Sequence, residues 1–203
     1  MKSLVSGSIS LLFVLQVAYC LLDNDLNKPH KDRYVLHKNC ELAIHKQIDE
    51  EMHASLVYAS MAAHFDHNSI ARKGFAKFFA DNSLEEREHA HKFIDYLNSR
   101  GARFAGFDIK MPSKASWNKG LDALTDALNL EKHVNNKLHH LHDVASLQCI
   151  DQHLMDFLEG EFFVEQVKSI DQLSRYISIV KGMDSPMGEY LFDQELQGKK
   201  TEL

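Results

Sequence analysis

Four long segments of this chain carry apolar residues at steps of three and four, and this repetition limits the fold more than any other feature. Such steps place the side chains on one face of an α-helix. The pattern predicts helices over residues 37–66, 72–100, 119–146 and 151–181. A helix with one apolar face must bury that face against a neighbour. The sequence therefore predicts an all-α fold built on a four-helix bundle.

The connections between these helices indicate their order in space. Three of the breaks are short, whereas Gly101 to Asn118 is long, contains Gly106 and Pro112, and has no strong periodicity. One long connection among short ones is typical of a bundle whose middle crossover runs its full length. We expect the first two helices to be antiparallel, and the last two likewise. A short fifth helix is predicted over residues 186–197.

The N-terminal segment differs from the rest of the chain. Lys2 is followed by a mainly apolar stretch from Ile9 to Val17 and then by Ala18-Tyr19-Cys20, a pattern typical of a secretory signal peptide. The apolar run is shorter than the roughly 20 residues that span a membrane. We predict a signal peptide at residues 1–20, an N-terminal extension at 21–36, and the bundle domain at 37–203. The predicted location is the secretory pathway or the medium.

The C-terminus reads Lys200-Thr201-Glu202-Leu203, close to a signal for retrieval to the endoplasmic reticulum. Chance is the alternative explanation, and Thr201 favours it, so retention in the endoplasmic reticulum or Golgi stays open. The net charge of -6 and the lack of a basic run give no indication of nucleic-acid binding.

Polar residues interrupt the apolar stripes near the middle of all four helices. These residues are Glu51, Glu86, His89, Glu131 and Gln166. A buried carboxylate costs several kcal/mol even after relaxation, and three close together also repel one another, so they need shared protons or a bound cation. Three carboxylates and one imidazole suit iron(II) or manganese, with zinc as a competitor.

Glu86 and His89 form a Glu-x-x-His pair, which places both side chains on one helix face. This spacing is already known from di-iron carboxylate bundles. A second such pair is missing, because Val134 stands three residues after Glu131. Glu50 and His53 have the same spacing, but their helix face is otherwise polar, and we expect them to be solvated. Other histidines, such as His45 and His64, are also expected on the surface.

The chain from about Lys38 to Phe192 resembles animal ferritin heavy chains. The resemblance is carried by six motifs at matching spacing: Glu51–Tyr58 (EMHASLVY), Phe75–Phe79 (FAKFF), Glu85–Ala90 (EEREHA), Leu130–Lys132 (LEK), Glu165–Lys168 (EQVK) and Glu189–Asp193 (EYLFD).

This resemblance implies a di-iron centre that oxidises iron(II) with dioxygen. Glu51 and His89 would hold one iron, Glu86 would bridge, Glu131 would hold the second, and Glu85 would be a mobile carboxylate beside it. Ferritin light chains lack this set, so its presence implies a catalytic subunit.

Tyr58 and Gln166 would orient the ligands from the second shell of the centre. His91 departs from the acidic residue that heavy chains often have, which makes mineral nucleation by Glu88 less secure than oxidation.

Asp156 and Glu159 begin the fourth predicted helix, where acidic residues are favourable whatever their function. The family resemblance implies instead that they line a three-fold pore for iron, with His142 and His153 nearby. It also implies a 24-subunit-type shell around a ferric mineral, alone or with other ferritin subunits. Glu195 departs from the histidine that vertebrate heavy chains place at the four-fold axis, which puts the lining of that axis in doubt.

Removal of the signal peptide would leave two cysteines, Cys40 and Cys149. The predicted topology places both at the same end of the bundle, so we propose an intrachain disulfide. Unpaired thiols or a bridge between subunits are the alternatives.

Two other functions compete with catalysis. The chain would be a structural or iron-carrying ferritin subunit if the centre were inactive. It would be a secreted four-helix cytokine if the acidic residues in its stripes had no metal to bind.

Overall fold

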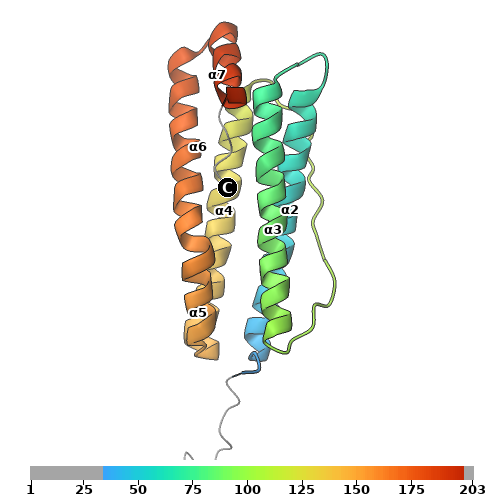
Figure 1. Cartoon of the computed structure of the whole chain (residues 1–203), viewed down its shortest axis with the longest axis vertical. Coiled ribbons are helices and arrows are strands. Elements are labelled where there is room, and N and C mark those ends of the chain that lie inside the picture. The colour runs from blue at the N-terminus through green and yellow to red at the C-terminus, as the bar shows by residue number, and fades with distance from the viewer. Residues whose placement is uncertain (1–33, 199–203) are drawn as a thin grey trace, which may run out of the picture. The chain divides into compact units, whose positions relative to one another are not determined.

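Figure 1 shows a computed structural model of the chain, and the structure describes residues 34–198. These residues form helices joined by loops, without strands, which confirms the all-α prediction. Four predicted helices and the short fifth one begin and end within two residues of their predicted limits. The helices are α2 (Lys38–Asp66), α3 (Lys73–Ser99), α4 (Gly120–Val144), α5 (Gln152–Leu158), α6 (Val164–Met183) and α7 (Pro186–Gly198), with π-helical segments η1 (Ala145–Cys149) and η2 (Glu159–Phe163).

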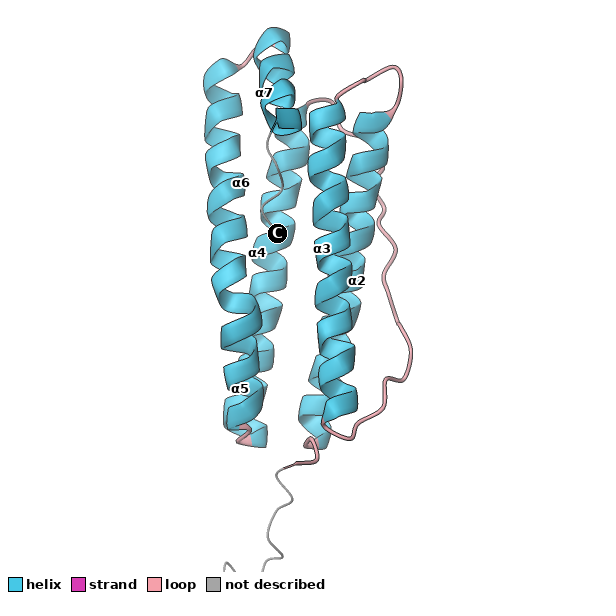
Figure 2. Ribbon diagram, in the orientation of Figure 1, coloured by secondary structure: helices cyan, strands magenta, loops and turns pink. Residues whose placement is uncertain are grey.

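Helix α2 packs against α3 and α4, and α4 packs against α6. The long connection between α3 and α4 runs along the outside of the bundle, as the pink loop in Figure 2 shows. Four side chains of α2 hydrogen-bond the backbone of this loop: His45, Asp49, His53 and His64. His45 and His64 are half-buried because they hold the loop, which differs from the surface position expected for them.

The fourth predicted helix is not one uniform α-helix. Its α5 and α6 parts are joined by η2, whose wider turns hold more residues per turn than an α-helix. Before α5, η1 ends at Ile150, which adopts a left-handed backbone conformation with φ of 52°. The Asp151 carboxylate then accepts a hydrogen bond from the Leu154 N–H at 3.1 Å and caps α5. Local hydrogen bonds therefore fix the turn between η1 and α5.

A disulfide joins the first turn of α2 to η1. Cys40 and Cys149 are both fully buried and their Cα atoms lie 6.4 Å apart, within the usual range for a disulfide. The proposed intrachain pairing is thus confirmed over the unpaired and intersubunit alternatives.

Helix α7 packs at the opposite end and caps two other helices. The Asp193 carboxylate accepts from the Phe75 N–H at 3.0 Å, and the Glu189 carboxylate accepts from the Gly120 N–H at 2.9 Å. Both acceptors lie at helix N-termini, where negative charge is favourable. Gly74 has no room for a Cβ atom because the Asp193 backbone lies against it. Glu195 is exposed on this helix.

Two apolar cores lie along the bundle, one near the disulfide and one near α7. The first contains Ile48, Phe93 and Phe162, and the second contains Phe65 and Phe79. The polar residues predicted to cluster occupy positions between these cores along the helices. Among residues 34–198, no helix is long and apolar enough to cross a membrane. Residues 1–33 and 199–203, with the predicted signal peptide, most of the extension and the whole terminal motif, lie outside the described residues.

Candidate metal centre

Side chains from all four long helices meet in the polar layer between the two cores. Glu51 comes from α2, Glu86 and His89 from α3, Glu131 from α4 and Gln166 from α6. Each is at most 5% exposed. Carboxylates are seldom buried this deeply without a partner. The helical register that the apolar stripes impose brings together the residues selected from the sequence.

Three of these residues offer ligand atoms around one point. One atom each from Glu51, Glu86 and His89 lies within 4.8 Å of the other two. Glu131 lies across the cluster and is held by two neighbours. The Tyr58 hydroxyl donates to Glu131 Oε1, and Gln166 Nε2 donates to Glu131 Oε2 at 3.1 Å. Tyr58 and Gln166 therefore contact Glu131, as orienting residues must.

Two oxygens of the layer are buried without a hydrogen-bond partner. They are Glu51 Oε2 and Gln166 Oε1. An unsatisfied buried oxygen costs about 1–3 kcal/mol, and more when it is charged. No Lys or Arg among the described residues forms an ion pair with Glu51, Glu86 or Glu131. Hard oxygen donors and one imidazole, with no Lys or Arg of residues 34–198 paired to the three carboxylates, fit a divalent cation such as iron(II).

Burial and mutual repulsion change the acid–base behaviour of the cluster. Burial raises the pKa of Glu51 well above 4.5, and the neighbouring Glu86 carboxylate raises it further. The pKa of Glu86 is raised for the same reason, with Glu131 as the main neighbouring charge. Burial and the Glu131 carboxylate also raise the pKa of the Tyr58 hydroxyl, which stays protonated as a donor. Without a cation, burial and repulsion therefore favour the protonated forms of these groups.

A second group of ligand atoms adjoins the first through His89. Glu85 and Glu165 each offer an atom within 4.8 Å of one on His89. His89 Nε2 lies 3.2 Å from a Glu165 oxygen. Burial and the Glu165 carboxylate raise the pKa of Glu85 to about 8, whereas the hydrogen bond from His89 is the main reason that the pKa of Glu165 falls to about 2. Burial lowers the pKa of His89, but the surrounding carboxylates outweigh it and the net direction is upward.

Glu165 was not selected from the sequence. It precedes Gln166 and lies at the edge of the apolar stripe, half-exposed, so its register alone suggests a solvated residue. The expected position of Glu85 was beside the second iron ligand Glu131. In the structure Glu85 lies against Glu165 and His89, and the Glu131 charge also raises its pKa, so its place beside the second iron stays a prediction.

The predicted pore residues lie outside this layer. Asp156 and Glu159 are exposed near the end of the bundle that carries α5. Glu159 pairs with His142 at 2.9 Å, and His153 contacts the Tyr96 hydroxyl at 3.1 Å. The role of these residues at a three-fold pore stays a prediction.

The rival Glu-x-x-His pair also lies apart from the centre. Glu50 pairs with Lys137 at 2.9 Å and with His133 at 3.1 Å, and His53 bonds the backbone of the long loop. Both residues are half-buried in these contacts rather than fully solvated as expected, and they lie outside the carboxylate layer. His91 and Glu88 are exposed on α3.

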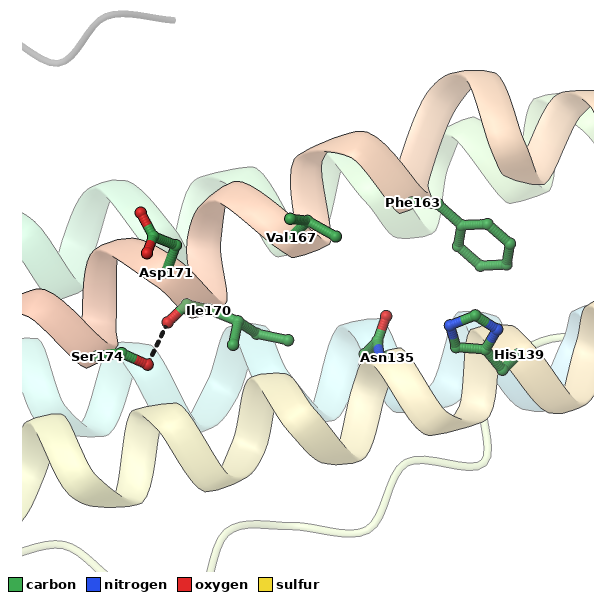
Figure 3. A pocket seen from close by; sticks show the side chains of 7 residues that line it. All are labelled: Asn135, His139, Phe163, Val167, Ile170, Asp171 and Ser174. Carbon is green, nitrogen blue, oxygen red and sulfur yellow. Dashed lines mark hydrogen bonds between the residues drawn. The ribbon is translucent and has the colours of Figure 1, made fainter.

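A shallow groove between α4 and α6 has a volume of about 460 Å³. Figure 3 shows its lining, including a hydrogen bond from Ser174 to the Ile170 carbonyl at 2.7 Å. None of its residues belongs to the carboxylate layer. The lining consists of Asn135, His139, Phe163, Val167, Ile170, Asp171 and Ser174.

Comparison with known proteins gives the family of the chain. Residues 41–183 match the model of the ferritin-like domain. The chain belongs to the ferritin family. It is 46% identical to the ferritin middle subunit of Salmo salar, over 81% of this chain and 95% of that protein. It is 47% identical to the soma ferritin of Lymnaea stagnalis, over 78% of this chain and 91% of that protein.

Ferritins bind and store iron and form multi-subunit shells. The carboxylate layer of this ferritin lies within the matched region, as do all residues predicted for the centre and the pore. The four-helix bundle with a short C-terminal helix agrees with this family.

Proposed function

We propose that this ferritin subunit is a ferroxidase, which oxidises iron(II) with dioxygen and passes the ferric product to a stored mineral. The observation that carries the proposal is the buried cluster of Glu51, Glu86 and His89 facing Glu131, with no Lys or Arg among the described residues paired to its carboxylates. A structural subunit gains nothing from three buried carboxylates, because an apolar core is often as stable or more so. A substrate cation gives them a function.

Each residue has a distinct role in this proposal. Glu51 and His89 bind one iron(II), Glu86 bridges, and Glu131 binds the second. Tyr58 and Gln166 hold the Glu131 carboxylate in place through the hydrogen bonds described above. Glu85 lies next to the centre against Glu165, where it would receive or release a cation by changing its rotamer.

Protons and iron compete for the same oxygens. Burial and repulsion raise the pKa values of Glu51 and Glu86, and they raise the pKa of Glu85 to about 8, so the cation-free centre favours protonated carboxyl groups. A bound cation removes the repulsion that raises these values, and the protons leave. The centre is then ready to bind two divalent cations at little cost in reorganisation, because its carboxylates and one imidazole are already assembled.

The test is a double substitution, Glu86→Ala with His89→Ala. We expect fast iron(II) oxidation to fall by more than about 100-fold, since changing outer partners of a metal site alone costs 10–100-fold. The fold should be retained, because removing buried charge is often neutral or stabilising. Stopped-flow absorbance of the ferric product measures the rate, and circular dichroism measures the helix content.

The matched control is Glu50→Ala with His53→Ala, which removes an equally spaced pair from the outer face of the bundle. This control should oxidise iron(II) at the wild-type rate. A Glu86, His89 variant that keeps the wild-type rate would show that the centre lies elsewhere. A wild-type protein that binds iron but does not oxidise it would favour the non-catalytic carrier.

We propose further that the chain assembles into a 24-subunit-type shell, alone or with other ferritin subunits. In that shell Asp156 and Glu159 would line the pore through which iron enters. Both side chains are exposed in the single chain and thus accessible to neighbouring subunits. Gel filtration tests the assembly, because a shell elutes far ahead of a 23.3 kDa chain.

The proposed location is the secretory pathway or the medium. It rests on the apolar N-terminal segment and is consistent with the Cys40–Cys149 disulfide, a bond that oxidising compartments favour.

A further inference from the structure

Gln47 is a polar side chain in an apolar part of α2. It is 2% exposed and lies one turn before Glu51, next to the buried residues Ile44 and Ile48. Burying an amide without hydrogen bonds destabilises a protein. A leucine would fill this position with a gain in apolar burial. The amide therefore has a partner or a function that offsets its cost.

The partner is the Glu51 carboxylate. Gln47 Nε2 donates to Glu51 Oε1 at 2.8 Å, and both side chains are buried. The second oxygen, Glu51 Oε2, has no hydrogen-bond partner. The hydrogen bond thus holds Oε1 and leaves Oε2 available, and one oxygen of Glu51 lies within 4.8 Å of ligand atoms of Glu86 and His89.

Glu131 on the opposite side of the centre shows the same arrangement with different residues. Tyr58 and Gln166 hold its two oxygens. For Glu51, Gln47 is the side chain that donates a hydrogen bond. Each of the two carboxylates at the ends of the centre is therefore held by a glutamine amide.

The choice of an amide has an electrostatic reason. A Lys or Arg at position 47 would also donate to Glu51, but its positive charge would neutralise the carboxylate and repel a cation. A neutral amide orients the carboxylate and leaves its full negative charge for the metal. It also cannot accept the protons that the cluster releases.

We propose that Gln47 is a positioning residue of the metal centre, which fixes the Glu51 side chain so that Oε2 points to the bound cation. This inference rests on the proposed function, because it assumes that Glu51 is a metal ligand. Binding of the cation beside Glu51 and His89 would then depend on Gln47, although Gln47 does not contact the cation.

The experiment uses Co(II) as the probe, because its visible spectrum reports coordination and it does not turn over with dioxygen as iron(II) does. The full chain in its assembled state is titrated as wild type, as Gln47→Leu and as Gln47→Met. Both replacements introduce an apolar side chain of a size similar to that of Gln47 into the core, so at least one variant should fold. Ser55→Ala is the matched control, because Ser55 is a buried polar residue of α2 that bonds Ser83 and none of the carboxylates.

We expect Gln47→Leu and Gln47→Met to weaken Co(II) binding at one site by about 10–100-fold and to change the Co(II) spectrum. Helix content should stay at the wild-type value, and Ser55→Ala should bind Co(II) with the wild-type affinity and spectrum. An unchanged spectrum and affinity in the folded Gln47 variants would overturn the inference while leaving the proposed function intact. A wild-type chain that binds no Co(II) would overturn the proposed function, and the inference with it.

Discussion

Reduction of the Cys40–Cys149 disulfide should destabilise the bundle by an amount that follows from its topology. The bond joins residues 109 positions apart, at the start of α2 and in η1. In the chain-entropy model a closed loop of this length restricts the unfolded chain by about 5 kcal/mol. Both sulfurs are fully buried, and reduced cysteines pack as small apolar groups, so the folded state changes little.

The assay is guanidinium unfolding of the wild-type chain with and without reductant, at one protein concentration so that assembly contributes equally. With a slope of about 4–5 kcal/mol per molar, the midpoint should fall by about 1 M on reduction. The double variant Cys40→Ala, Cys149→Ala is the control, and reductant should leave its midpoint unchanged. Equal midpoints for the oxidised and reduced wild type would refute the reasoning, because the loop would then not be closed in solution.

Three further predictions concern protons, pore and location. Because burial and Glu165 raise the pKa of Glu85 from 4.5 to about 8, the cation-free fold binds a proton that the unfolded chain loses. The free energy of unfolding should therefore fall as pH rises between these values. Zn(II) binding at pH 7 should release protons, which calorimetry in two buffers measures. Zn(II) binding without proton release would contradict the raised pKa of Glu85. Asp156→Asn with Glu159→Gln should slow iron uptake most at low ionic strength, where screening is weak, whereas equal uptake there would place the pathway elsewhere. The full chain expressed in animal cells should lose residues 1–20 and reach the medium or secretory organelles. An uncleaved cytosolic protein would disprove the predicted signal peptide. Removing Lys200–Leu203 should increase secretion only if that motif acts in retrieval.

The helices and the composition of the centre could be predicted because both depend on periodicity. Glu51, Glu86, Glu131 and Gln166 stand in phase with apolar residues, and a register error of one residue would move a side chain by about 100° around the helix. The steps of three and four therefore determined which side chains meet. The disulfide followed from the same topology, since one long crossover places Cys40 and Cys149 at one end of the bundle.

Other features depend on details that periodicity does not record. The π-helical segment η2 shifts the hydrogen-bonding pattern of the fourth helix without a change in composition. Glu165 contacts His89 from the edge of its stripe, where a solvated carboxylate would look the same in sequence. His45 and His64 are half-buried because the long loop packs over them, and the path of this loop depends on tertiary contacts. Gln47 could have been recognised in the sequence, because it is a polar residue four positions before Glu51 in a buried stretch of α2.

The central claim is that two substrate cations bind between the four helices. The most direct measurement is anomalous X-ray diffraction from crystals of the full assembly soaked anaerobically in iron(II). We expect anomalous peaks beside Glu51, Glu86 and His89 and beside Glu86 and Glu131, and their disappearance in the Glu86→Ala, His89→Ala variant. A wild-type crystal with iron at other positions and none in this layer would contradict it.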